Sequence, residues 1–238
     1  LGVRVGVFGH AGDGNFHPTF VMEREDERAE EKVNAVRAEL FARVLEMGGM
    51  VEAQVSQAVY SLANFSGETA TQVLQQEERV NQMEVEIDRD LSAIIARRQP
   101  TARDLRLLIA ISKIIANLER VGDEAARIAR TVQRLINTGV SSRLRLPVAD
   151  LGFEAELAIA QLRKALDAFA RLDTAQALQV LKGDDQIDQE FDGLMRKLIT
   201  YMMEDPRTIT SWIALVFVAK ALERVGDHAK NISEAVIY

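Results

Sequence analysis

The residues best suited to chemistry in this sequence are acidic pairs within a repeated hexapeptide. Leu-Glu-Arg-Val-Gly-Asp occupies residues 118–123 and again residues 222–227. In the first copy the acids are Glu119 and Asp123, and a spacing of four residues places both carboxylates on one face of a helix. Like charges at this spacing repel each other by about 0.2–0.5 kcal/mol, so we expect a cation or an arginine to offset them.

The segment that precedes each hexapeptide carries a matching feature. Asp184 and Asp188 are also four residues apart, and they align with Glu77 and Asn81 in the other half of the repeat. If the two helices of each half pack side by side, their side chains converge on a cage of hard oxygen atoms, which suits Mg, Ca, Mn or non-haem iron. The predicted metal ligands are Asp184, Asp188, Glu223, Asp227 and Asn231 in the second half, and Glu77, Asn81, Glu119 and Asp123 in the first half.

The two predicted sites differ in charge, because Asn81 replaces an acid in the first half. Hard cations respond to the number of charged ligands, so we expect the second half to bind metal more tightly. The alternative is that the acids form solvated faces neutralised by Arg120, Arg127 or Arg224. Spacing alone leaves both interpretations open.

A glycine is retained in both hexapeptides, at Gly122 and Gly226. Glycine inside a helix costs about 1 kcal/mol relative to alanine. Its presence in both copies predicts the close approach of a neighbouring helix or of a ligand.

The elements that must position these residues are helices. The chain has 238 residues, 47% of them hydrophobic but only 5% aromatic, and only 4 prolines. That composition is typical of packed helices. Apolar residues follow a helical period, for example in the stripe Val51, Val55, Ala58, Val59 and Leu62.

Breaks in this pattern fall near residues 64–69, 99–101, 137–147, 172–174 and 204–208. Several breaks carry helix-capping chemistry: Ser66 or Thr69, Thr101, and Asp205 before Pro206. The pattern predicts six helices of roughly 25–35 residues, three in each half. Because the repeat covers two helices of each half, we infer a tandem duplication of a three-helix bundle.

Residues 1–40 differ from the rest of the chain. Their sequence predicts a short strand, a glycine-rich turn and a second short strand, and nothing in the bundles repeats it. We therefore predict an all-α protein of two tandem three-helix bundles behind a short non-helical, possibly β, segment. The predicted domains are residues 1–40, 41–142 and 143–238.

Composition also limits the function. A formal charge of −7 without a long basic tract argues against nucleic acid, and the absence of cysteine excludes disulfides and thiolate metal sites. The apolar runs are too short for a spanning helix, and we expect no signal peptide. The chain starts at Leu1 and ends within an apolar-periodic run, so we expect a fragment.

Several motifs together resemble one family of regulators. The repeated hexapeptide, residues 97–106 (RRQPTARDLR) and residues 201–209 (YMMEDPRTI) resemble the PhoU family of phosphate-signalling regulators, as do residues 47–54 and 83–88. The resemblance runs from about residue 40 to the end. It implies an accessory protein of the phosphate ABC transporter that negatively controls a phosphate-sensing histidine kinase.

The resemblance also implies specific site residues, partners and a location. The family's acidic motifs bind multinuclear metal clusters in some members, and they correspond to the four motif pairs named above. We expect Fe, Zn, Mg or Mn. The implied partners are the transporter's ATPase subunit, the histidine kinase and a second copy in a homodimer. The implied location is cytoplasmic and peripheral to the inner membrane, with contact to the membrane only through partners.

The front segment resembles a different family. Residues 9–18 (GHAGDGNFHP) are similar to the C-terminal domain of FAD-linked glycolate and D-lactate oxidases, where two histidines help to bind a divalent metal. Those histidines are His10 and His17 here. The chain has no flavin domain and no later Glu-His-Gly, so we expect no flavin and interpret the segment as a fused remnant.

Three functions compete. The first is a non-catalytic regulator that binds other proteins, which we favour because the chain lacks a nucleophile–base pair. The second is a carboxylate-bridged metal protein of ferritin-like type, which requires Glu-x-x-His motifs that this chain does not contain. The third is a fragment of a flavin-dependent 2-hydroxy-acid oxidase. We therefore predict that the protein is not an enzyme.

Overall fold

The structure is a computed structural model. It describes residues 4–9, 16–21, 27–98, 100, 102–139 and 148–238. Side chains are described from residue 38 onward, apart from those of residues 98, 103, 148, 149, 184 and 185 within the described ranges. Internal contacts divide the chain into two compact units, residues 1–41 and residues 42–238. The predicted domain limit at residue 142 lies outside the described residues.

The first unit begins with a β-hairpin. Strands β1 (Arg4–Gly9) and β2 (Phe16–Val21) pair antiparallel, with Phe8 opposite His17. Their sequence alternates β-branched and other residues on either side of a glycine-rich stretch, which is the pattern that predicted two strands. His10 lies outside the described residues, and nothing is described of the His17 side chain.

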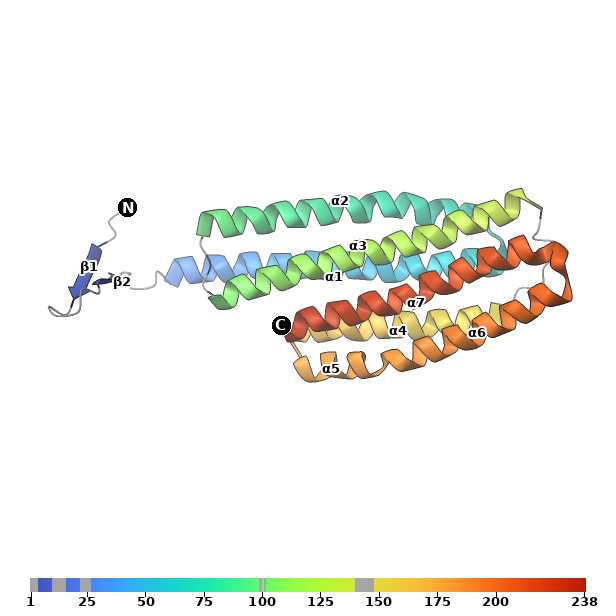
Figure 1. The fold of residues 1–238 in the computed structure, drawn as a ribbon. Helices are drawn as coiled ribbons and strands as arrows, with labels where there is room; N and C mark the ends of the chain where they lie inside the picture. The colour runs from blue at the N-terminus through green and yellow to red at the C-terminus, as the bar shows by residue number, and fades with distance from the viewer. Residues whose placement is uncertain (1–3, 10–15, 22–26, 99, 101, 140–147) are drawn as a thin grey trace. The chain divides into compact units, whose positions relative to one another are not determined.

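Helices dominate the described residues that follow the hairpin and form two three-helix bundles, as the sequence predicts (Figure 1). The first bundle consists of α1 (Glu27–Asn64), α2 (Gly67–Arg98) and α3 (Ala102–Asn137). The second consists of α4 (Val148–Arg171), α5 (Thr174–Lys182) with α6 (Asp184–Glu204), and α7 (Ile209–Ile237), preceded by the 3₁₀ turn η2 (Pro206–Thr208).

One of the six predicted helices is divided into two. The break between α5 and α6 falls at Gly183, whose N–H bonds to the carbonyls of Gln179 and Val180 and so closes α5. Glycine is a poor helix former, and Asp184 and Asp185 follow it at the positively polarised start of α6. This local chemistry ends one helix and begins the next without a loop.

Two of the predicted caps are present. The hydroxyl of Ser66 accepts a hydrogen bond from the N–H of Thr69 at 3.2 Å, and Asp205 accepts one from the N–H of Arg207 at 3.1 Å beside Pro206. Thr101 lies outside the described residues. Capping depends on a few neighbouring residues, which explains why sequence reasoning located these helix ends.

The turns after α1 and α4 show the duplication in the backbone. Phe65 and Leu172, which are equivalent in the repeat, both adopt a positive φ, of 47° and 51°. The next residue in each turn donates its N–H five residues back, from Ser66 to Ser61 at 2.9 Å and from Asp173 to the carbonyl of residue 168 at 2.9 Å. Two non-glycine residues in this uncommon conformation at equivalent positions indicate one ancestral turn.

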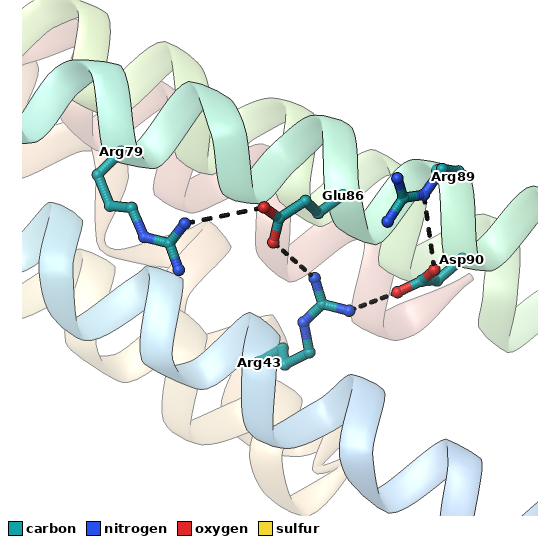
Figure 2. Close-up of polar contacts among 5 residues, drawn as sticks. All are labelled: Arg43, Arg79, Glu86, Arg89 and Asp90. Atoms are coloured by element: carbon teal, nitrogen blue, oxygen red, sulfur yellow. Dashed lines mark hydrogen bonds and ion pairs between the residues drawn. The ribbon is translucent and has the colours of Figure 1, made fainter.

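Ion pairs connect α2, the outer helix of the first bundle, to α1. Figure 2 shows Arg43 on α1 between two acids of α2, at 3.3 Å from Glu86 and 2.5 Å from Asp90. Arg79 and Arg89 on α2 approach the same two acids at 3.8 and 3.9 Å. These side chains are partly exposed, so the network orients the helices and adds little stability.

The two bundles contact each other through α1 and α4 and through α3 and α7. A Cβ atom on Gly48 would lie 2.8 Å from the side chain of Leu166, so the glycine admits α4 close to α1. Glu52 and Arg163 form an ion pair beside this contact. The inner helices therefore meet across the pseudo-repeat, and α2 and α5–α6 cover the outside (Figure 1).

Candidate functional site: two acidic clusters and the groove between α3 and α7

The repeated hexapeptides lie in the middle of α3 and α7. Leu118 and Val121 on α3 are fully buried, as are Leu222 and Val225 on α7. The apolar positions of each copy thus point into the core of their own bundle, as the helical period predicts. The acids lie at the flank of this stripe, where Glu119 and Glu223 are partly buried and Asp123 and Asp227 are exposed.

The first acidic cluster consists of Glu77 on α2 with Glu119 and Asp123 on α3. Glu77 is only 5% exposed, and its Oε2 accepts a hydrogen bond from Nε2 of Gln54 at 2.8 Å. Burial raises the pKa of Glu77 to about 7 even though the Gln54 hydrogen bond opposes the shift, and the charges of Asp123 and Glu119 raise it further. These three predicted residues therefore lie close enough for their charges to act on one another.

Several acceptor atoms around this cluster have no donor. Among the described side chains, Oε1 of Glu77, Oε1 of Gln54 and Oδ1 of Asn81 are buried without a hydrogen bond. A buried oxygen without a donor costs about 1–3 kcal/mol, so such atoms need an explanation. All three are hard oxygen atoms of the type that coordinates cations. The donor set fits a hard cation in chemical type.

The glycine of the first hexapeptide makes room for this cluster. A Cβ atom on Gly122 would lie 2.9 Å from Oε2 of Glu77, 3.2 Å from Oε1 of Gln54 and 3.3 Å from Cγ1 of Val80. In the second half, a Cβ atom on Gly226 would lie 2.8 Å from Cδ1 of Ile187. The predicted close approach of a neighbouring helix is confirmed at both glycines.

Buried glutamines are the part of the site that the sequence reasoning missed. Gln54 and Gln161 occupy equivalent positions in the two halves and are 0% and 6% exposed. Each donates to the backbone of its second helix, Gln54 to the carbonyl of Val73 at 3.2 Å and Gln161 to that of Val180 at 3.3 Å. Extending the internal alignment to the first helix of each half would have paired them.

The acids of the second half have different neighbours from those of the first half. Glu223 forms an ion pair with Lys220 on its own helix, Nζ to Oε1 at 2.6 Å, while its Oε2 is buried without a hydrogen bond. Lys220 corresponds to Ala116 in the first half. Asp188 is exposed and has an interaction of its own, and nothing is described of the Asp184 side chain. A lysine therefore already offsets one of the acids predicted to bind metal.

An additional acid, Glu154 on α4, joins Glu223 in the second half. Glu154 is 1% exposed, and neither of its oxygens has a hydrogen bond in the described residues. Burial raises its pKa to about 8, with smaller contributions from the charges of Glu223 and Glu190. The equivalent position in the first half is Met47, which is fully buried. Glu154, Glu190 and Glu223 form what we call the second acidic cluster.

The predicted metal cages do not assemble in full. Within the part of the chain that the structure describes, no three histidine, aspartate or glutamate side chains are grouped so that they could hold a metal ion. In the second half, Asp227 and Asn231 line the space between the bundles. Metal binding by the nine predicted residues therefore stays a prediction.

A groove runs between α3 and α7, and its central pocket has a volume of about 540 Å³. Asp123 and Asp227, one from each hexapeptide, both line this pocket together with Arg120 and Arg224. Arg224 also donates to Oε1 of Glu124 at 3.1 Å, which links the two bundles. Two of the three arginines that the sequence predicts as neutralising partners, Arg120 and Arg224, thus lie in the groove.

A polar network links α3 to α7 beside the groove. Asn117 donates its own Nδ2 to the carbonyl of Lys113 at 2.8 Å, so its Oδ1 is the acceptor. That oxygen accepts from Nδ1 of His228 at 3.1 Å and from Nδ2 of Asn231 at 3.2 Å. Burial, with the nearby charges of Arg120 and Arg224, lowers the pKa of His228 to about 4. His228 is therefore a neutral donor at physiological pH.

Of the helices in the described residues, none combines the length and apolar character needed to span a bilayer.

Comparison with known proteins identifies the duplicated part. The family model for the PhoU domain matches residues 44–132 and again residues 154–236, one match in each bundle. The chain belongs to the PhoU family. A second family model, for the C-terminal domain of FAD-linked oxidases, matches residues 1–54 only.

Relatives and solved structures of the PhoU family agree with this assignment. The chain is 46% identical over 208 residues to a phosphate-specific transport system accessory protein PhoU homolog of Pseudomonas putida, covering 87% of this chain and 80% of that protein. It is 43% identical over 205 residues to the PhoU of Escherichia coli K12, covering 86% and 83%.

Two PhoU crystal structures have the same fold. The PhoU of Pseudomonas aeruginosa superposes with a TM-score of 0.81 at 42% identity, over 86% of this chain and 97% of that one. The regulatory protein PhoU of Streptococcus pneumoniae superposes with a TM-score of 0.78 at 28% identity, over 86% and 95%. The duplicated bundles described above are therefore the fold of this family.

Proposed function

We propose that this protein is an accessory protein of a phosphate-specific transport system and a negative regulator of phosphate uptake and phosphate-responsive signalling. The observation that carries the proposal is the match of both bundles to the PhoU domain, together with 46% and 43% identity to two accessory proteins over most of their length. The protein acts by binding other proteins and is not an enzyme. It works in the cytoplasm, and only its partners attach it to the inner membrane.

Replacement in living cells tests this proposal. The chain is expressed in a bacterium whose own PhoU has been deleted, and phosphate uptake and a phosphate-starvation reporter are measured in phosphate-rich medium. We expect the chain to restore repression of both. Gly122→Val should fail to do so, because its side chain collides with Glu77 and Gln54. Gly193→Val is the matched control, because nothing lies within 4 Å of a Cβ atom there. No repression by the well-expressed parent chain would refute the proposal.

The proposed partners are the ATPase subunit of the phosphate transporter, a phosphate-sensing histidine kinase and a second copy of the chain. Support comes from the names of the relatives, which place them in a phosphate-specific transport system. Purified chain is mixed with each partner and the mass of the complex is measured by light scattering. A monomer that binds neither partner would contradict this assignment.

A second candidate function, cation binding, is favoured by the buried oxygens of the first acidic cluster. Glu77, Glu119 and Asp123 would supply carboxylates, and Gln54 and Asn81 would supply amide oxygens. Divalent or ferric ions such as Mg, Mn, Zn or Fe suit this donor set in type. A bound cation would neutralise acids that the protein alone leaves uncompensated.

The structure changes the expected order of affinity between the two halves. Lys220 already offsets Glu223, whereas Ala116 stands at the equivalent place in the first half. We therefore expect tighter binding in the first half, the reverse of the order that the acid count predicts.

Calorimetric titration of Mn²⁺ into metal-free protein compares two double variants. Glu119→Gln with Asp123→Asn should remove most of the heat of binding, and Glu223→Gln with Asp227→Asn should remove less. Equal losses, or no heat with the parent protein, would refute the cation proposal.

A further inference from the structure

We propose that the second half of α3 and the first half of α7 form a docking surface for an acidic amphipathic helix of a partner protein. This basic–apolar surface consists of Arg127, Arg130 and Arg134 on α3 with Ile213 and Phe217 on α7. The proposal rests on the proposed function, because a regulator that works by binding proteins needs such a surface. The proposal specifies where one partner protein binds and which side-chain chemistry binds it.

Two contacts set the register of the helices that carry the surface. Glu124 on α3 pairs with Arg224 on α7, and Asn117, seven residues earlier on α3, contacts Asn231, seven residues later on α7. The two helices therefore run antiparallel along the groove, as Figure 1 shows. Seven residues correspond to two helical turns, so equal steps from the Glu124–Arg224 pair reach the same level on both helices.

A step of seven residues from the Glu124–Arg224 pair, taken in the opposite direction along both helices, reaches the proposed surface. Seven residues beyond Glu124 is Thr131, which is 2% exposed, and seven residues before Arg224 is Phe217. Arg127 and Arg134 lie about one helical turn on either side of Thr131, so along the helix axis they flank the level of Phe217. Ile213 lies one turn nearer the start of α7. Apolar and cationic side chains thus share one stretch of the groove's rim.

The aromatic ring of this surface is not required by the fold. Phe217 is 57% exposed and Ile213 is 43% exposed. In the first half, the position equivalent to Phe217 is Lys113, in a helix that packs in the same way. The fold accommodates a lysine at that position, so folding does not require an aromatic residue there. The exposed ring of Phe217 therefore serves a purpose other than folding. Exposed aromatic side chains of this kind are typical anchors of protein interfaces.

The charge of the surface is opposite to that of the protein. The formal charge of the chain is −7, yet residues 125–139, which the structure describes, contain three arginines and no acid. Residues 209–222 of α7 also contain no acid. Within the described residues Arg130 has no ion pair, and Arg134 donates only to the carbonyl of Arg130 and to Thr131. Only Arg127 reaches a carboxylate, that of the buried Glu124 at 3.4 Å.

These features define the partner. Arg127 and Arg134 are separated by two helical turns, which is about 10 Å along the axis. A partner helix with carboxylates seven residues apart and apolar side chains between them matches both the arginines and the exposed ring. Carboxylate–arginine pairs set the register and the specificity, and the apolar contact supplies most of the affinity.

A designed peptide tests the proposal with a defined probe. The probe is a fluorescent helical peptide of six turns that carries glutamates at heptad spacing on either side of a leucine stripe. A second peptide has lysine in place of each glutamate. Anisotropy is measured in low salt with the full chain and three variants: Phe217→Lys, which copies the residue of the first half, Arg130→Glu with Arg134→Glu, and the control Arg97→Glu with Arg106→Glu. Circular dichroism verifies that every variant is folded.

The expected result is binding of the acidic peptide by the parent chain and the control, and at least tenfold weaker binding by the other two variants. The lysine peptide should not bind. Absence of binding to the acidic peptide, or equal binding by all variants, would overturn the proposal. Binding to phosphatidylserine vesicles that is lost in the same variants, without peptide binding, would assign the surface to lipid and also overturn it. If the chain restores repression in cells but does not bind the acidic peptide, the docking-surface proposal is wrong and the proposed function still holds.

Discussion

Replacing Glu154 by methionine should stabilise the protein at neutral pH. Methionine is the residue at the equivalent position, Met47, where it is fully buried in the same kind of helix packing. Glu154 is buried to the same degree but has no hydrogen-bond donor in the described residues. The substitution therefore exchanges an uncompensated acid for an apolar side chain that the duplicated scaffold already accommodates.

The magnitude follows from the shift in the pKa of Glu154, from an ordinary value of 4.5 to about 8. Below pH 4.5 the carboxyl group is protonated in both folded and unfolded chains, and it has no effect on the pH dependence. Above that pH the unfolded chain ionises while the folded chain keeps its proton, so stability falls until the pH passes 8. At pH 7 the loss amounts to about 3 kcal/mol, and at pH 5 to less than about 1 kcal/mol.

Urea unfolding in EDTA, followed by circular dichroism between pH 5 and pH 8, measures this effect. Glu154→Met should unfold at higher urea than the parent chain at pH 7, and the gap should narrow toward pH 5. Glu156→Gln, which removes an exposed acid from the same helix, should change little at either pH. A gap that is equal at pH 5 and pH 8, or a less stable methionine variant at pH 7, would refute the reasoning.

Three further predictions concern single positions. Gly122→Ala should lower the free energy of unfolding by about 1–3 kcal/mol because of its contact with Glu77, whereas Gly193→Ala, in open space, should raise it by up to about 1 kcal/mol; thermal unfolding compares them. Leu172→Gly should raise stability by about 0.5–1 kcal/mol because φ is 51° there, and Gly139→Ala, at φ 66°, should lower it; the opposite order in urea midpoints would contradict this. Glu77→Gln should remove a loss of stability between pH 4.5 and pH 7, since burial raises the pKa of Glu77 to about 7; an unchanged pH profile of unfolding would disagree.

Sequence reasoning succeeded where the cause is local. The burial of Leu118 and Val121 follows from a helical period that any packed helix must obey. The caps at Ser66 and Asp205 depend on a side chain and on an N–H group two or three residues away. The repeat itself required no structure, since it is visible as a constant spacing. These features determine the fold class and the place of each acidic pair along its helix.

The site was harder to predict because it depends on the direction of each side chain. Residues four apart on a helix are displaced by about 40° around its axis, so Glu223, Asp227 and Asn231 turn progressively away from their own bundle. Glu223 remains close enough to Glu154 on α4 for their charges to interact, and Asn231 reaches Asn117 on α3. A shared spacing of four therefore does not place three residues at one site. Which of them face the core is decided by the packing of both bundles.

Glu154 was missed for a related reason. An acid in a helical sequence is normally assigned to the surface, because burying an unpaired carboxylate costs free energy. Only the alignment with Met47, together with the packing of α4 in the structure, shows that this position points inward. The same alignment pairs Lys220 with Ala116 and so explains why the second half offsets Glu223 internally.

The differences between the halves carry more functional information than the repeat does. Duplication alone would give two identical faces, and a symmetric protein would bind the same ligand twice. Here the first half has Ala116 and several uncompensated buried oxygens, while the second half has Lys220 and Glu154. The second half likewise has Phe217 on the rim of the groove, where the first half has Lys113. At each of these positions the equivalent residue of the other half is different, and that half has the same fold. The fold therefore does not require the particular residue at that position. The two halves of the protein therefore present different chemistry on one fold, which suits a regulator that contacts more than one partner.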